Sequence, residues 1–169
     1  MDEKLEKTHE NEELRRIYEE DVAELTGADW KNTEVLARIK ENCKKRKERV
    51  EEIVSVGELK VGADYHHAAL IFQHGNTSAD FKQANRLAKK GMELGEERSK
   101  WLYAATFDRW MLSLGKPQKY GTQFRKGKNG DPEVVKPIDE SVTDKERAKY
   151  NVPSLAEAVE IHKKKYGLT

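Results

Sequence analysis

Apolar residues at helical spacing, in runs that end at glycine, constrain the fold of this chain most strongly. Leucine, isoleucine, valine and tyrosine recur every three or four residues over about 12–25 and again over 36–54, and Gly27 and Gly57 follow the two runs. This spacing places apolar side chains on one face of a helix, and glycine commonly ends helices. Further helices are predicted at about 63–74, 78–94, 97–114 and 154–166, with a short helical turn at 143 or 144.

The sequence offers little of the alternation that is typical of β-strands, so it predicts an all-α fold. A long irregular stretch rich in glycine and lysine, from about 115 to 140, precedes the last helix. At 169 residues the chain suits one compact helical bundle. We therefore expect a polar tail over 1–10, one helical domain over 11–169 and a motif-rich core over 61–124.

Charged residues make up 37% of the chain, but its net charge is only +1. This balance predicts a salt-rich helical surface and argues against nucleic acid as a partner. No apolar run approaches the roughly 18 residues that span a bilayer, so no membrane association is expected. The single Cys43 cannot form an internal disulfide, and residues 1–7 lack the apolar core of a signal peptide. A cytoplasmic location is the corresponding expectation.

Unusual polar residues concentrate between Asp64 and Gln123. Three of the five histidines lie within residues 66–74, and Asp108 and Arg109 interrupt an otherwise apolar helix. Buried polar groups need partners. The cluster therefore indicates either a polar network that fixes the fold or a pocket that holds a ligand.

The spacing of the histidines argues against a metal site on one helix. His67 and His74 share a face but lie two turns apart, roughly 10 Å along the axis. A helical zinc site requires histidines one turn apart, as in H-E-x-x-H, and this spacing is absent. A metal would need Asp64 or Asp108 as a ligand from across the helices, and we assign no metal and no cofactor.

The segment repeats itself weakly at a spacing of 36 residues. Ala68-Ala69 aligns with Ala104-Ala105, and Tyr65 aligns with Trp101. Over about one and a half units, this echo resembles a Sel1- or tetratricopeptide-type helical repeat, which implies a helix-hairpin core. The two echoing helices would then lie side by side in the same direction. This packing predicts Gln73 near the level of Arg109 and His74 near Trp110, with Asp108 one step away.

Longer strings resemble a bacterial family of unknown function. They are Ala63-Asp-Tyr-His-His-Ala-Ala-Leu-Ile-Phe-Gln-His-Gly75, Trp101-Leu-Tyr-Ala-Ala-Thr-Phe-Asp-Arg-Trp110 and Gly115-Lys-Pro-Gln-Lys-Tyr-Gly-Thr-Gln123. Glu13-Leu-Arg-Arg16 and Asn151-Val-Pro-Ser-Leu155 extend the likeness over most of the chain. The resemblance carries no established activity, so it supports the boundaries of the candidate site and leaves its chemistry open.

The candidate site combines acid–base and anion-binding side chains. A carboxylate beside an imidazole orients it and raises its basicity, and arginine grips carboxylates or phosphates. The loop 115–124 is the expected cover, although it lacks a phosphate-cradling motif. The alternative is that Asp108 and Arg109 clamp this loop while the histidines bind backbone carbonyls. The predicted catalytic residues are His66, His67, His74 and Asp108, and the predicted ligand-binding residues are Asp64, Gln73, Arg109, Lys116, Gln118, Tyr120 and Gln123.

Two functions follow from this pattern. The first is a cofactor-independent acid–base enzyme or small-molecule binder, which the concentration of ionisable groups on apolar helices favours. The alternative is a Sel1- or tetratricopeptide-like protein-interaction module that holds an extended peptide, with the polar cluster serving the fold and the basic loop at 115–130 selecting acidic partners. The sequence indicates no particular oligomeric state.

Overall fold

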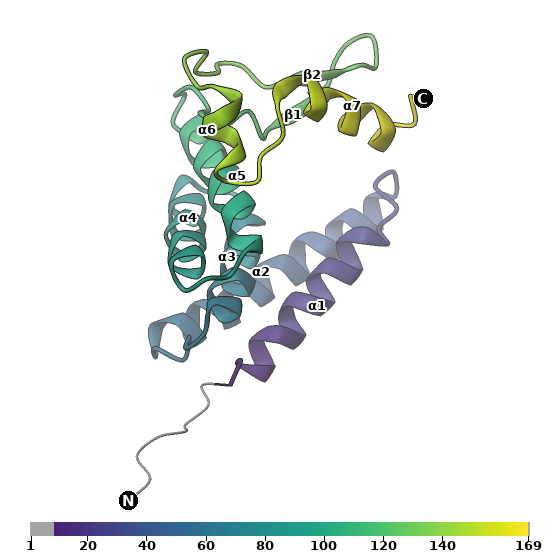
Figure 1. The fold of residues 1–169 in the computed structure, drawn as a ribbon. Helices are drawn as coiled ribbons and strands as arrows, with labels where there is room; N and C mark the ends of the chain where they lie inside the picture. Colours follow the sequence, from purple (N-terminus) through teal and green to yellow (C-terminus); the bar gives the residue numbers. More distant parts are fainter. Residues whose placement is uncertain (1–8, 169) are drawn as a thin grey trace, which may run out of the picture.

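The computed structural model describes residues 9–168, which form seven helices and two short strands (Figure 1). The predicted all-α fold is therefore confirmed, with a small β-hairpin added. Residues 1–8 of the predicted tail lie outside the described residues. The elements are α1 (Glu12–Thr26), α2 (Thr33–Ser55), α3 (Gly62–Gln73), α4 (Ser78–Glu93), α5 (Arg98–Ser113), β1 (Phe124–Lys126), β2 (Pro132–Val134), α6 (Asp144–Ala148) and α7 (Leu155–Lys165).

Capping residues set the helix boundaries where the sequence places them. The Asn32 side chain accepts hydrogen bonds from the backbone N–H groups of Glu34 and Val35, at 3.0 and 3.2 Å. Thr77 and Asp80 form a capping box at the start of α4. These contacts satisfy N–H groups that the first helical turn leaves without a partner. The predicted starts of α2 and α4 are thus confirmed.

Helices α3, α4 and α5 form the centre of the molecule (Figure 1). At one end, Gly62 packs so closely that an added Cβ would lie 2.9 Å from the Cβ of Glu96. At the other end, Arg109 donates a hydrogen bond to the carbonyl oxygen of Gln73. Helices α3 and α5 therefore run side by side in the same direction, as the 36-residue echo predicts. The echoing alanine pairs at 68–69 and 104–105 are completely or almost completely buried at this centre.

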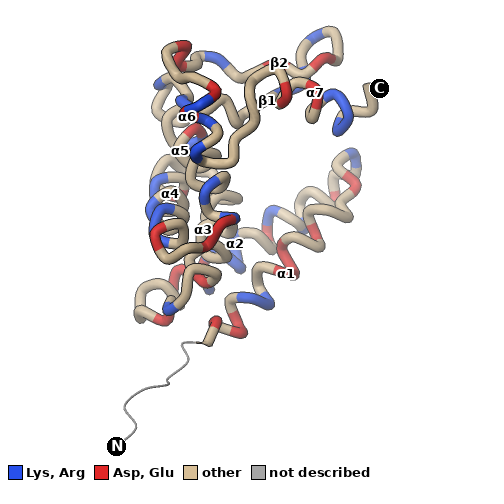
Figure 2. The backbone as a smooth tube through the Cα atoms, viewed as in Figure 1, with Lys and Arg blue, Asp and Glu red and all other residues tan. Residues whose placement is uncertain are grey.

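Helices α1 and α2 form an antiparallel pair that packs on α3 and then extends away from it (Figure 1). Leu14 of α1 and Val50 of α2 are completely buried. Residues of both charge signs occur along each helix (Figure 2). Lys45 and Glu41, for example, form an ion pair of 3.5 Å one turn apart. This agrees with the predicted salt-rich surface. None of the described helices is long and apolar enough to cross a membrane.

The stretch expected to be irregular contains the one element that the sequence misses. Strands β1 and β2 pair antiparallel, with Phe124 opposite Val134 and Lys126 opposite Pro132. Each strand has only three residues, and so short a segment shows no recognisable alternation of apolar and polar residues. After them, α6 begins at Asp144, where the short helical turn was predicted, with Thr143 as its N-cap, and α7 begins at Leu155 after the N-cap Ser154.

Candidate functional site

The predicted site residues belong to three separate sets of contacts. His66 and His67 lie in the first half of α3, where α1 covers them. Asp108 faces the loop after α5. His74 immediately follows α3, next to Gln73, and Arg109 reaches this point from α5. The structure thus brings Arg109 to Gln73, the residue before His74, and it gives the other predicted residues different neighbours.

The histidine pair on α3 lies in the interface with α1. His66 and His67 are only 6% and 3% exposed. The ring of Tyr18 from α1 stacks on His67 with 4.1 Å between ring centroids. His66 Nδ1 lies 3.3 Å from Ser99 Oγ, at the start of α5. These contacts hold α3 against α1 on one side and α5 on the other, and they leave little of either imidazole accessible to a substrate.

Burial also determines the charge of this pair. It lowers the pKa of His66 to about 4, with a further contribution from the nearby positive charge of Arg98. It lowers the pKa of His67 to about 4 as well, with His66 as the next influence. Both imidazoles are therefore neutral near pH 7. A neutral, enclosed imidazole of this kind serves packing better than proton exchange with solvent.

The low pKa values predict acid destabilisation. In the unfolded chain these histidines titrate near the ordinary value of 6.5. Between pH 6.5 and pH 4 the unfolded state therefore binds more protons, and the free energy of unfolding should fall by up to about 1.4 kcal/mol per pH unit for each histidine. Urea unfolding at several pH values measures this slope. His66→Gln should reduce it, whereas His9→Gln, at an exposed position, should leave it unchanged. Equal slopes in the wild type and His66→Gln would contradict the assignment.

Asp108 clamps the loop that follows α5. Its carboxylate is completely buried and accepts four hydrogen bonds of 2.7–2.9 Å. The donors are the backbone N–H groups of Lys119, Tyr120 and Thr122 and the Thr122 hydroxyl. Burial raises the pKa of Asp108, although these donors act in the opposite direction. These four contacts correspond to the loop-clamping alternative, and none of them involves an imidazole.

Two glutamines strengthen the same loop. The Gln118 side chain is completely buried, accepts from the Gln123 N–H and donates to the carbonyl oxygens of Gln123 and Val135. The Gln123 side chain donates to the Ala105 carbonyl at 3.3 Å. Tyr120 is buried among aromatic rings, with the ring of Tyr150 5.0 Å away. These predicted ligand contacts are thus occupied within the protein.

The two remaining predicted ligand-binding residues also lie apart from His74. The Asp64 carboxylate is completely buried and accepts hydrogen bonds from the backbone N–H groups of Asn11, Lys60 and Val61. It therefore ties the starts of α1 and α3 together. Lys116 is exposed in the loop after α5.

The carboxylate beside His74 comes from α1. His74 Nδ1 lies 2.7 Å from Asp21 Oδ2, and Asp21 is only 1% exposed. The other oxygen of Asp21 accepts a hydrogen bond of 3.0 Å from Arg46 of α2. Arg46 also contacts Glu24 at 2.7 Å, and Glu24 accepts a hydrogen bond from Asn42. The His74 side chain remains 23% exposed. A fixed, ionic network thus supports one face of an accessible imidazole.

Arg109 approaches the same chain segment from α5. Its Nη1 donates to the Gln73 carbonyl oxygen at 3.3 Å, directly before His74 in the chain. Its Nε is buried and makes no hydrogen bond to the described residues, and the same holds for Gln73 Oε1. Burial alone lowers the pKa of Arg109. Arg109 thus has a buried donor, Nε, without an acceptor among residues 9–168, and Gln73 has a buried acceptor, Oε1, without a donor there. The two residues are joined by the hydrogen bond from Arg109 to the Gln73 carbonyl.

Asp21 and Arg46 were not among the predicted site residues, although the sequence carries a signal for both. Asp21 continues the apolar stripe of Leu14, Ile17 and Tyr18 on α1 at a spacing of three or four residues. Arg46 similarly lies on the apolar face of α2. A charged residue within an apolar stripe is forced into the helix interface. It therefore requires a charged or polar partner there.

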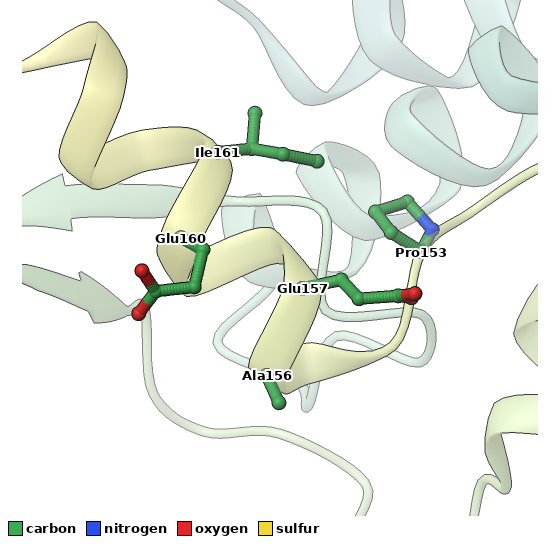
Figure 3. A pocket seen from close by; sticks show the side chains of 5 residues that line it. All are labelled: Pro153, Ala156, Glu157, Glu160 and Ile161. Atoms are coloured by element: carbon green, nitrogen blue, oxygen red, sulfur yellow. The ribbon is translucent and has the colours of Figure 1, made fainter.

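An open apolar pocket lies elsewhere, on α7 (Figure 3). It contains none of the predicted site residues. Within residues 9–168, no three histidine, cysteine, aspartate or glutamate side chains gather closely enough to hold a metal ion. The pocket is lined by Pro153, Ala156, Glu157, Glu160 and Ile161.

Comparisons with known proteins identify the chain only at the level of a family. A comparison with curated proteins gives no match, and a comparison with solved structures gives none either. The Sel1-type resemblance of the core therefore stays a prediction, although the parallel arrangement of α3 and α5 is confirmed. A family model with the description "family of unknown function (DUF6624)" matches residues 10–169, and the chain belongs to this family.

Proposed function

We propose that the protein is a cofactor-independent enzyme that transfers protons on a small-molecule substrate, with His74 as its general base. One observation carries the proposal: a partly exposed imidazole lies 2.7 Å from a carboxylate that is almost completely buried. The sequence pattern indicated the same chemistry with Asp108 as the carboxylate. Asp21 takes that position here.

The contact with Asp21 assigns distinct tasks to the two nitrogens of His74. In the neutral imidazole, Nδ1 carries the proton and donates it in a hydrogen bond to Asp21, which leaves the lone pair on Nε2 for the substrate. Nε2 accepts a proton from the substrate or from an attacking water and later returns it to the product. The Asp21 carboxylate stabilises the imidazolium that forms in between. Arg46 fixes the orientation of that carboxylate through a hydrogen bond to its other oxygen.

The other predicted catalytic residues do not compete for this role. His66 and His67 are enclosed between α1 and α3, and the oxygens of Asp108 are occupied by the loop. In our proposal these residues build the scaffold that holds α1, α3 and α5 in register. The active site is then smaller than the sequence suggests, and it lies at the end of α3.

Substitution of His74 tests the proposal. The wild-type protein and His74→Gln are incubated in D2O with a panel of small carboxylic acids, amides and sugar phosphates, and NMR detects exchanged or transformed compounds. We expect His74→Gln to lower the rate by about 10²–10⁴-fold, which is the usual contribution of a general base. The melting temperature should change by only a few degrees, because the imidazole is partly exposed.

His9→Gln is the matched control, because His9 is exposed and remote in the fold from the end of α3. Nitrogen NMR of the wild type should also show the Nδ1–H tautomer of neutral His74. If the wild type changes no compound faster than His74→Gln does, the proposed function is wrong.

A second candidate function is the protein-interaction module. Two observations favour it: His66 and His67 are buried, and the pocket on α7 is lined mainly by apolar side chains. Glu157 and Glu160 flank this pocket, so it suits a basic partner better than the acidic one expected from the loop. The module does not require His74, and the His74→Gln comparison therefore separates the two functions.

A further inference from the structure

Arg109 differs from the other enclosed arginines in having no carboxylate partner. Arg46 contacts both Asp21 and Glu24, and Arg147 contacts Asp144 at 2.9 Å. No ion pair joins Arg109 to any carboxylate of the described residues, and its Nε makes no hydrogen bond within them. Arg109 as a whole is only half-buried, but its Nε is buried, and a buried N–H group without an acceptor is costly. This guanidinium is thus prepared for an anion from outside the chain.

Gln73, the residue whose backbone carbonyl Arg109 contacts, carries an acceptor without a partner in the described part of the chain. It is only 6% exposed, and its Oε1 is buried without a hydrogen bond to the described residues. Its backbone carbonyl is bound by Arg109 Nη1. Gln73 therefore connects the two groups: it is hydrogen-bonded to the guanidinium of Arg109, and His74 follows it directly in the chain.

We propose that Arg109 and Gln73 form a binding subsite for a small carboxylate that carries a hydroxyl group on the carbon next to it, as in a 2-hydroxy acid. The planar guanidinium matches a carboxylate geometrically, and it binds both oxygens where two N–H groups are free. Gln73 Oε1 requires a donor, which a bare carboxylate lacks and the hydroxyl supplies. The role of the bound molecule as a substrate rests on the proposed function of His74, whereas its binding does not.

The contact with Gln73 also has a purely structural consequence. Arg109 binds the last carbonyl of α3, where a positive charge favourably meets the negative end of the helix dipole. This capping contact uses Nη1 and leaves Nε unengaged. Capping alone therefore does not explain why the guanidinium lies among buried groups without an anion.

Four small probes separate the features of the ligand. Glycolate has the carboxylate and the hydroxyl, acetate has only the carboxylate, glycolamide has the hydroxyl without the charge, and inorganic phosphate is an anion of different shape. NMR titration of the full-length protein, observed at the Arg109 Nε–H and the Gln73 side-chain amide, gives the four affinities. We expect glycolate to bind about tenfold more tightly than each of the other three, since one satisfied hydrogen bond is worth about that factor.

Variants then assign this preference to the two residues. Arg109→Lys keeps a charge to cap α3 and should weaken glycolate binding at least about tenfold, because lysine lacks the planar fork. Gln73→Met, of similar volume, should make glycolate and acetate bind equally. Arg86→Gln, at an exposed position on α4, is the control and should bind glycolate as the wild type does.

His74→Gln distinguishes this inference from the proposed function. Glycolate should bind this variant within about threefold of the wild type, because Arg109 and Gln73 hold the ligand. If proton transfer depends on His74 but glycolate binding does not depend on Arg109, the subsite is wrong and the general base stands. The reverse result retains the subsite and removes the general base. Equal affinities for the four probes, tightest binding of phosphate, or unchanged glycolate binding by Arg109→Lys would each overturn the inference.

Discussion

Replacing Asp108 by alanine is expected to lower the free energy of unfolding by roughly 3–5 kcal/mol, because it deprives three backbone N–H groups and one hydroxyl of their acceptor. The carboxylate is completely buried, and no other described group accepts a hydrogen bond from the backbone N–H groups of Lys119, Tyr120 and Thr122. The loop they belong to leads into β1 and helps to enclose the aromatic cluster around Tyr120. Urea unfolding at pH 7 measures the loss.

A graded series tests the cause of this loss. Asp108→Asn keeps one acceptor oxygen and should cost less than alanine, and Thr122→Val removes one of the four donors and should cost about 1 kcal/mol. Asp131→Ala removes an exposed carboxylate and should change the stability by less than about 0.5 kcal/mol. Amide hydrogen exchange should show that Asp108→Ala loses protection at residues 119–122. An Asp108→Ala protein within about 1 kcal/mol of the wild type would contradict the clamping role.

The helices could be predicted from the sequence because their signals are local. The side chains of Asn32, Thr77 and Ser154 each accept a hydrogen bond from a backbone N–H group that lies within three residues in the chain. Helical spacing and capping chemistry act over the same short range. The β1–β2 hairpin lacks such a signal, since three-residue strands depend on pairing with one another. The fold was thus predictable wherever neighbouring residues determine it.

The candidate site was predictable only in part, for the same physical reason. The 36-residue echo correctly placed Gln73 beside Arg109, because parallel helices bring equivalent positions to the same level. The partner of His74 could not be read in this way. Asp21 lies 53 residues earlier in the chain, outside the repeated segment, and the echo pointed to Asp108 on the parallel helix instead. Asp108 instead turns to its own following loop, which offers four donors.

Asp21→Asn should reduce both stability and activity. Asparagine has nearly the same shape as aspartate but no charge, so Arg46 loses one of its two carboxylate partners and His74 loses the group that orients it. We expect the free energy of unfolding to fall by about 2–4 kcal/mol, which is typical of a broken buried ion pair. The proton-transfer rate should fall by at least about a hundredfold. Urea unfolding and the NMR assay with D2O measure the two effects.

Glu24→Gln is the control that separates these effects. Glu24 also binds Arg46 and accepts from Asn42, but it makes no contact with His74. This variant should lose stability while it retains the wild-type rate and the Nδ1–H tautomer of His74. If Asp21→Asn behaves in the same way as Glu24→Gln, the buried network serves only to hold α1, α2 and α3 together. If the rate falls in Asp21→Asn alone, Asp21 takes part in the chemistry of His74. Both variants disturb Arg46, but only Asp21→Asn changes a group that contacts the imidazole.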